Sequence, residues 1–213
     1  MKYVKMLGLA AVVAAALMAF VGASSASATV LCKTTPTAGT CPPGQAYEAG
    51  TEIHAVNVGT VKLDTTFKNV ECSGSTVKGV TSNEGGPTET VTGPEASAAL
   101  TFTGCNCTVN VLKPGTLEIH LIEGTNNGTL TSNGAEVTVS CSTLFGTVHC
   151  IYETTNDSIG DLTASATSTS AAIFHSTAVI NRKPTAAICS EESTWTATYE
   201  VTSPKPLYVA KET

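Results

Sequence analysis

Short segments in which apolar and polar residues alternate dominate the sequence beyond its N-terminal part. In the segment 194–203, TWTATYEVTS, the residues Trp195, Ala197, Tyr199 and Val201 alternate with threonine and glutamate. Successive side chains of a β-strand point to opposite faces, so this pattern predicts a strand with one buried and one solvated face. Helical periodicity is almost absent after the N-terminal segment. We therefore expect an all-β protein.

Turn-forming residues separate these segments at intervals of about ten residues. Short strands with such regular punctuation are typical of antiparallel sheets, and we predict an antiparallel β-sandwich of the immunoglobulin-like or jelly-roll-like kind. Expected turns include Lys113-Pro114-Gly115, Asn133-Gly134 and Asn156-Asp157. The expected strands lie at 51–58, 60–67, 75–82, 98–104, 116–123, 135–141, 147–152, 171–180 and 194–203.

Residues 1–28 have the layout of a secretory signal peptide. Lys2 and Lys5 precede an apolar run of about fifteen residues, and Ala26 and Ala28 form a small-residue cleavage site before Thr29. We expect secretion, to the medium or to the cell envelope, and no membrane span in the mature protein. The rest divides into a Cys/Pro/Gly-rich N-terminal arm at 29–50 and a single sandwich domain at 51–213.

The charge composition excludes one large class of partners. Only 13% of the residues are charged, the formal net charge is −6, and Arg182 is the one arginine. Proteins that bind nucleic acid need a basic surface that neutralises phosphates, so no nucleic-acid partner is expected. Threonine and serine must supply most of the polar side chains on the exposed strand faces.

Eight cysteines, an even number, predict a disulfide framework in an exported protein. Spacing favours Cys32–Cys41 and Cys141–Cys150, each closing a short loop, with Cys72–Cys189 as a long-range bridge and Cys105–Cys107 as the remaining local pair. In an extended strand the Cα atoms of Cys105 and Cys107 would be about 7 Å apart, at the limit for a disulfide. The alternative therefore stays open that these two take separate partners such as Cys72 and Cys189. The eight predicted disulfide cysteines are Cys32, Cys41, Cys72, Cys105, Cys107, Cys141, Cys150 and Cys189.

Several motifs between residues 47 and 210 resemble a group of secreted proteins that occurs in many copies in high-GC Gram-positive soil bacteria. The most specific is TWTATYEVTSPKPLYVA at 194–210, and further motifs are YEAGTEIHA at 47–55 and VECSGSTVKGVTS at 70–82. The group tends to place two or three residues between the cysteines where this chain has only Asn106. The resemblance implies a secreted all-β protein and brings no activity or site residue with it.

Chemistry-bearing residues are few and dispersed. The chain has four histidines, His54, His120, His149 and His175, but neither a His-x-His nor an HExxH pattern. His120 shares a strand face with Glu118, as an acid/base pair or as two polar residues on a wet face. We expect no catalytic, cofactor or metal site, and therefore no enzyme.

The aromatic residues are the remaining candidates for recognition of a ligand. Tyr47, Tyr152, Tyr199, Tyr208 and Trp195 would suit a sugar-binding face, but the alternation at 194–203 places Trp195 and Tyr199 on the buried face. We expect a structural or adhesive extracellular protein that contacts envelope proteins or polysaccharide. A binding module for a sugar or a small apolar molecule is the alternative, which a deep pocket would favour. A hydrolase would need His120 to meet another histidine and a carboxylate in one cleft.

Overall fold

The computed structural model describes residues 28–94, 100–144, 146–184 and 187–213. Within these residues the chain has 0% helix and 63% strand, and its sheets are antiparallel. The prediction of an antiparallel all-β fold held together by disulfides is therefore confirmed. The predicted signal peptide, apart from Ala28, lies outside the described residues.

Most of the predicted strands are present, and several are longer than their alternating segments. The described strands are β1 (Thr29–Cys32), β2 (Glu52–Asn57), β3 (Val61–Asp64), β4 (Val70–Val80), β5 (Gly85–Gly86), β6 (Val91–Pro94), β7 (Thr101–Cys105), β8 (Thr108–Lys113), β9 (Thr116–Leu121), β10 (Gly128–Thr143), β11 (Gly146–Thr163), β12 (Ile173–Arg182), β13 (Glu192–Ser203) and β14 (Tyr208–Ala210).

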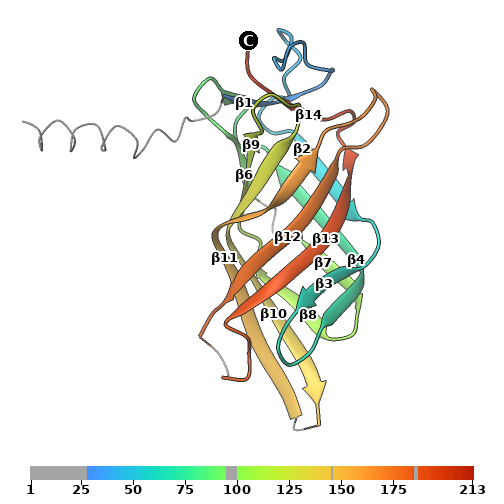
Figure 1. The fold of residues 1–213 in the computed structure, drawn as a ribbon, viewed down its shortest axis with the longest axis vertical. Coiled ribbons are helices and arrows are strands. Elements are labelled where there is room, and N and C mark those ends of the chain that lie inside the picture. The colour runs from blue at the N-terminus through green and yellow to red at the C-terminus, as the bar shows by residue number, and fades with distance from the viewer. Residues whose placement is uncertain (1–27, 95–99, 145, 185–186) are drawn as a thin grey trace, which may run out of the picture.

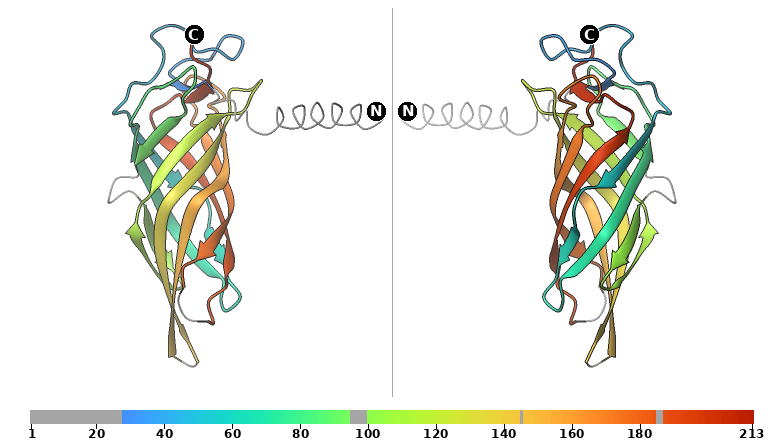
Figure 2. Two further views of the ribbon diagram at one scale, coloured as in Figure 1. Left: turned by 90° about the vertical axis from the view of Figure 1, so that its left-hand side faces the viewer. Right: turned by 90° about the vertical axis from the view of Figure 1, so that its right-hand side faces the viewer.

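Eleven of these strands form one sheet. Its order is β2-β4-β3-β13-β12-β11-β10-β9-β6, with β7 paired to β4 and β8 paired to β10. The sheet twists and curls so that its two halves face each other across an elongated interior (Figures 1 and 2). The end strand β6 closely approaches β4, which is next to the other end of the order, because a Cβ on Gly93 of β6 would lie 2.3 Å from the carbonyl oxygen of Val80 in β4. The two facing layers thus belong to a single continuous sheet.

Two of the predicted turns are wrong. Asn133-Gly134 lies inside β10 and Asn156-Asp157 lies inside β11, both at places where the register of the strand pairing shifts. Asn156 has a positive φ of 68°, and Gly134 has a φ of 74°. The residues that tolerate positive φ in turns also tolerate it in β-bulges, so the same dipeptides permit either structure. Because pairing with neighbouring strands continues past both points, each strand bulges and goes on.

The core lies between the facing halves of the sheet and follows the predicted alternation. In β13 the side chains of Ala197, Tyr199 and Val201 are buried, and Trp195 is partly buried beside them. One buried cluster gathers near the end that carries β1 and β14, with Leu121 and Phe174 among its members. A second gathers farther along the strands around four of the disulfide cysteines and Tyr152.

The N-terminal arm packs against one end of the large sheet. β1 is fully buried between β14 and β5 in a separate three-stranded sheet, at the end opposite the tip of the β10–β11 hairpin (Figure 1). Leu31 reaches the main core beside Leu207 and Val209. The Tyr47 hydroxyl donates a hydrogen bond of 2.7 Å to the carbonyl oxygen of Pro206, and burial raises the pKa of this tyrosine. The arm therefore closes this end of the interior.

All eight cysteines are in disulfides, and the predicted bridge Cys32–Cys41 is confirmed, with a Cα–Cα distance of 5.7 Å. The other three predicted pairings, Cys141–Cys150, Cys72–Cys189 and Cys105–Cys107, are wrong. The bridges that form are Cys72–Cys105, Cys107–Cys141 and Cys150–Cys189. Cys105 and Cys107 therefore take separate partners, as in the alternative that was left open. Of the two partners named in that alternative, Cys72 is correct and Cys189 is wrong.

Strand register explains these pairings. Cys72 lies directly opposite Cys105 in the β4–β7 ladder. The chain bends at Asn106 and Cys107, between β7 and β8, and the next residue, Thr108, already pairs with Ser140 of β10, so Cys107 lies beside β10. Cys141 and Cys150 are not opposite each other in the β10–β11 hairpin, because Cys141 pairs with Val148. Cys107, just before β8, forms a disulfide with Cys141, and Cys189, in the segment between β12 and β13, forms one with Cys150.

Candidate functional site

The interior of the large sheet contains a cavity of about 180 Å³ that is partly open to solvent. Residues from nine strands line it, those of β2, β4, β6, β7, β9, β10, β11, β12 and β13. It lies between the two core clusters, with Leu130 and Phe174 from the first and Val137 and Ala178 from the second. An apolar cavity of about 150 Å³ stays free of water and binds benzene or xenon. This cavity is therefore large enough for one small apolar molecule.

Five aromatic side chains contribute to the cavity wall: Phe102, Tyr152, Phe174, Trp195 and Tyr199. Phe102 and Trp195 make an edge-to-face contact with ring centroids 5.2 Å apart, and Phe174 stacks on Tyr199 at 6.0 Å. These pairs fix the rings relative to one another. The prediction that Trp195 and Tyr199 face the interior is confirmed. These two rings could therefore contact a sugar only inside the cavity and not on the outer surface.

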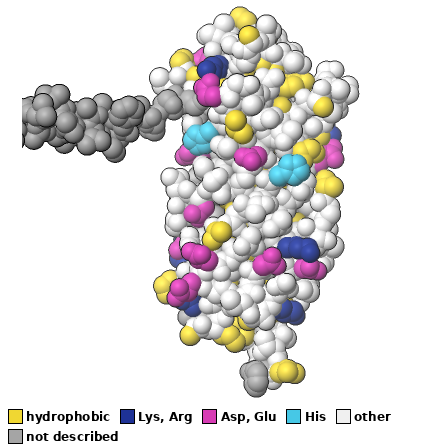
Figure 3. Space-filling view, in the orientation of Figure 1, with side chains coloured by type: hydrophobic (Ala, Val, Ile, Leu, Met, Phe, Trp, Pro, Cys, Tyr) yellow, Lys and Arg dark blue, Asp and Glu magenta, His cyan; other side chains and the backbone are white. Residues whose placement is uncertain are grey.

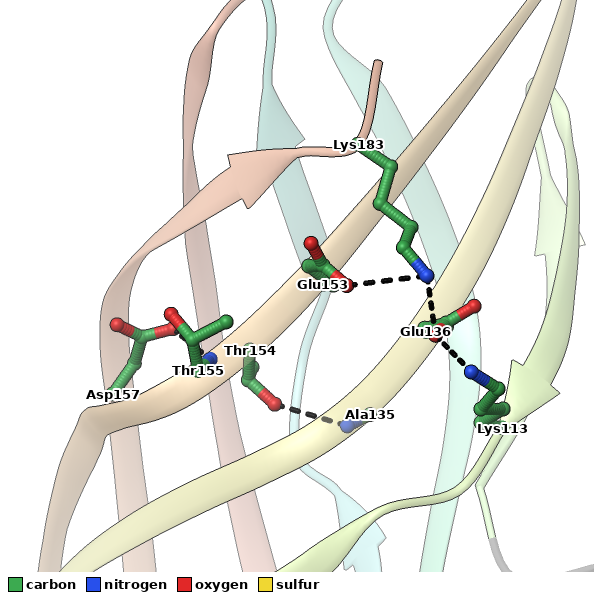
Figure 4. Close-up of polar contacts among 8 residues, drawn as sticks. All are labelled: Lys113, Ala135, Glu136, Glu153, Thr154, Thr155, Asp157 and Lys183. Atoms are coloured by element: carbon green, nitrogen blue, oxygen red, sulfur yellow. Dashed lines mark hydrogen bonds and ion pairs between the residues drawn. The ribbon is translucent and has the colours of Figure 1, made fainter. Parts of the chain in front are cut away.

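Most hydroxyl groups on the wall are hydrogen-bonded within the protein. The hydroxyl oxygens of Ser132 and Thr154 are 3.0 Å apart, and Thr154 also accepts a bond of 3.1 Å from the backbone N–H of Ala135 (Figure 4). Ser176 donates to the carbonyl oxygen of Ile159 at 2.7 Å. The Tyr199 hydroxyl lies 2.9 Å from Ser75 Oγ. These groups interrupt the apolar wall without offering a free polar atom.

Tyr152 is different. Its side chain is 0% exposed and lines the cavity, yet its hydroxyl oxygen has no hydrogen-bond partner among the described residues. A buried tyrosine hydroxyl usually finds a partner, and leaving it without one costs about 1–3 kcal/mol. Alternation along β11 predicts that Tyr152 points inward, between Cys150 and Thr154, which are also buried. Nothing in the sequence indicates that this hydroxyl group lacks a hydrogen-bond partner.

An ion-pair cluster fastens the strands beside this part of the wall. The Glu136 carboxylate, whose side chain is 10% exposed, accepts hydrogen bonds from Lys113 and, at 2.7 Å, from Lys183 (Figure 4). Lys183 also lies 3.4 Å from a Glu153 carboxylate oxygen. The two lysines lower the pKa of Glu136, and the bond to Glu136 raises the pKa of Lys183. The cluster ties β8, β10 and β11 to the segment that follows β12, and sequence spacing gives no hint of it.

The four histidines lie on different strands, and each contacts a residue on its own or a neighbouring strand. His54 Nε2 is 3.4 Å from Glu52 and His120 Nε2 is 3.5 Å from Glu118. His149 Nδ1 is 2.8 Å from Ser140 Oγ, and His175 Nδ1 is 3.3 Å from Thr198 Oγ1. The predicted proximity of His120 and Glu118 is thus present. Within the described part of the chain, no three His, Cys, Asp or Glu side chains gather in a group that could hold a metal ion.

Comparison with known proteins finds no counterpart. No family model, curated protein or solved structure matches this chain. Among the residues that the structure covers, there is no helix with the length and apolar character needed to cross a membrane. The four disulfides are consistent with an extracellular environment, where such bonds persist.

Proposed function

We propose that this chain is a secreted, non-catalytic protein that binds one small apolar molecule inside its curled sheet. The observation that carries the proposal is the cavity of about 180 Å³ with its largely apolar wall. The sequence alone favours an adhesive protein, with a binding module as the alternative that a deep pocket would support. Protein interiors are close-packed and leave few voids larger than a water molecule, so a cavity of this size needs an explanation.

The apolar wall of the cavity provides the driving force for binding a ligand. Side chains that face an empty apolar space lack van der Waals partners on one side, and a ligand of matching size restores those contacts. The ligand also removes its own apolar surface from water, worth about 25 cal/mol per Å². The aromatic pairs and the adjacent ion-pair cluster hold the wall in place, so little ordering is needed on binding. Export is supported by the signal-like segment 1–28 and by the disulfides.

Filling the cavity is expected to abolish binding. Ala178 is 3% exposed and lines the cavity, so Ala178→Leu places three additional carbon atoms in the ligand's space. In an NMR titration with p-xylene, the unmodified protein should show saturable shifts of methyl groups around the cavity. Ala178→Leu should show none, and the same is expected of the smaller filling variant Ala55→Val if the first variant does not fold.

The matched control is Thr177→Leu on the same strand. Thr177 is exposed on the outer face of β12, one residue from Ala178, so this substitution adds an apolar side chain outside the cavity. Its titration should equal that of the unmodified protein. Unchanged binding in folded Ala178→Leu and Ala55→Val, or no binding by the unmodified protein, would refute the proposed function.

An adhesive role is a second candidate, favoured by the outer face of β12 and β13. Thr177 is paired with Thr196, and His175 with Thr198, on a surface that is largely uncharged (Figure 3). Exposed apolar side chains on the face in Figure 3 are scattered, so contact with a partner there would be through hydroxyl groups. If this face adheres to envelope polysaccharide, Thr177→Glu with Thr196→Glu should abolish co-sedimentation with purified cell walls. Undiminished co-sedimentation, or none by the unmodified protein, would contradict this role.

A further inference from the structure

The cavity extends along the strands of the curled sheet. Four successive inward positions of β12 line it, namely Phe174, Ser176, Ala178 and Ile180. The pairing of β12 with β13 passes through these positions without a register shift, so the strand is regular here. At about 3.3 Å per residue, Phe174 and Ile180 are roughly 20 Å apart along the strand. The wall of the cavity therefore covers most of the length of β12.

The neighbouring strand β11 lines the cavity over the same length. Its lining residue Leu162 is opposite Phe174, and its lining residue Tyr152 is opposite Arg182, two residues beyond Ile180. The volume is nevertheless only about 180 Å³. A compact apolar cavity of about 150 Å³ holds a single benzene ring. A similar volume drawn out along two strands is long and narrow by comparison.

The side chains of the wall leave the middle of this space open. Ser176 and Ala178 are small and lie between the larger Phe174 and Ile180 on β12, and Gly79 of β4 adds no side chain to the wall. The Ser176 hydroxyl is already bonded to the carbonyl oxygen of Ile159. A ligand segment between the two ends therefore needs no polar group, and a branch or a fused ring would widen it without need.

We propose that the ligand class is a molecule with one unbranched aliphatic chain, which lies along β12 inside the curled sheet and keeps its polar head group in solvent. This ligand class rests on the proposed function and adds to it the shape of the molecule. Because the cavity is partly open to solvent, the head group can remain hydrated while the chain is buried. p-Xylene fills only the part between Phe174 and Ala178, whereas a chain also reaches the wall at Ile180.

A series of straight-chain alcohols measures the length of the site. Dissociation constants of 1-butanol, 1-hexanol, 1-octanol and 1-decanol are compared with that of cyclooctanol, which has as many carbon atoms as 1-octanol. Each methylene group that enters the cavity should tighten binding about fourfold, until the cavity is full. Cyclooctanol should bind at least about tenfold more weakly than 1-octanol, because a compact ring leaves the ends of the wall without van der Waals partners.

Two adjacent residues of β12 provide the variant and its matched control. Ile180 is 7% exposed and faces the cavity, whereas Val179 is 50% exposed on the outer face. Ile180→Phe shortens the cavity, so it should weaken binding of 1-decanol more than binding of 1-hexanol, and Val179→Phe should change neither. Ile180→Val lengthens the cavity and should favour 1-decanol over 1-hexanol, which keeps the test valid if Ile180→Phe does not fold.

The outcomes separate this ligand class from the proposed function. If p-xylene binds but 1-octanol and cyclooctanol bind equally well, the ligand is not an extended chain while the binding function stands. The same conclusion follows if the folded Ile180 variants change the affinities for 1-decanol and 1-hexanol by equal factors. If neither p-xylene nor any of the alcohols binds the unmodified protein, the proposed function fails and the chain-binding site fails with it.

Discussion

Removing the Cys107–Cys141 bridge by the double substitution Cys107→Ala/Cys141→Ala is expected to lower the free energy of unfolding by about 4 kcal/mol. The bridge joins residues 34 positions apart and fastens the beginning of β8 to β10. Without it, the unfolded chain gains the conformational freedom that the closed loop denied it. Urea denaturation of the oxidised protein and of the double variant measures the difference. Replacing both cysteines avoids a free thiol that could exchange with the other disulfides.

The bridge Cys32–Cys41 provides the comparison. Its residues are only 9 positions apart, so Cys32→Ala/Cys41→Ala should cost about 1 kcal/mol less than the Cys107/Cys141 variant. A larger loss from the shorter loop would contradict the loop-entropy argument. A peptide that links Cys105 to Cys107 in a non-reducing digest would contradict the pairing itself.

Gly160→Ala is the substitution with the second largest expected effect, about 2–4 kcal/mol of destabilisation. Gly160 has a φ of 143°, and a Cβ there would lie 2.0 Å from the carbonyl oxygen of His175 on β12. That oxygen belongs to the backbone, so β11 and β12 would have to separate where their pairing resumes after the bulge. Thermal and urea denaturation should both show the loss.

Gly134→Ala is the control for the backbone strain alone. Gly134 has a φ of 74°, but a Cβ at this position would meet nothing within 4 Å. Its substitution should therefore cost only about 1 kcal/mol, the penalty of a left-handed conformation. Equal losses from the two variants would show that the close approach of β11 to β12 at Gly160 does not matter.

The sequence predicts those structural features that depend on residues close together in the chain. The alternation in 194–203 identifies β13 and its buried face correctly, because strand periodicity is a local property. Cys32–Cys41 is also predictable, since a short loop brings its ends together whatever the rest of the chain does. Asn156-Asp157 shows the limit of this reasoning. Its residues suit a turn, and only the pairing with β10 makes them part of a bulged strand.

The candidate site could not be predicted from local sequence patterns. Side chains far apart in the sequence, such as Ala55 and Tyr199, meet at the cavity because a sheet with non-sequential strand order curls around it. The inward direction of Tyr152 follows from alternation, but the lack of a partner for its hydroxyl depends on every neighbouring strand. Likewise Cys107 and Cys141 meet through the register between β8 and β10, which spacing does not specify.

A crystal structure of the protein soaked in p-xylene tests the central claim most directly. We expect electron density for one ring inside the curled sheet, in contact with Phe174 and Ala178, and no such density in crystals of Ala178→Leu. A structure in which the side chains of Leu130 and Val137 close the space, or in which p-xylene occupies only surface sites, would contradict the claim that this protein binds a small apolar molecule in its interior.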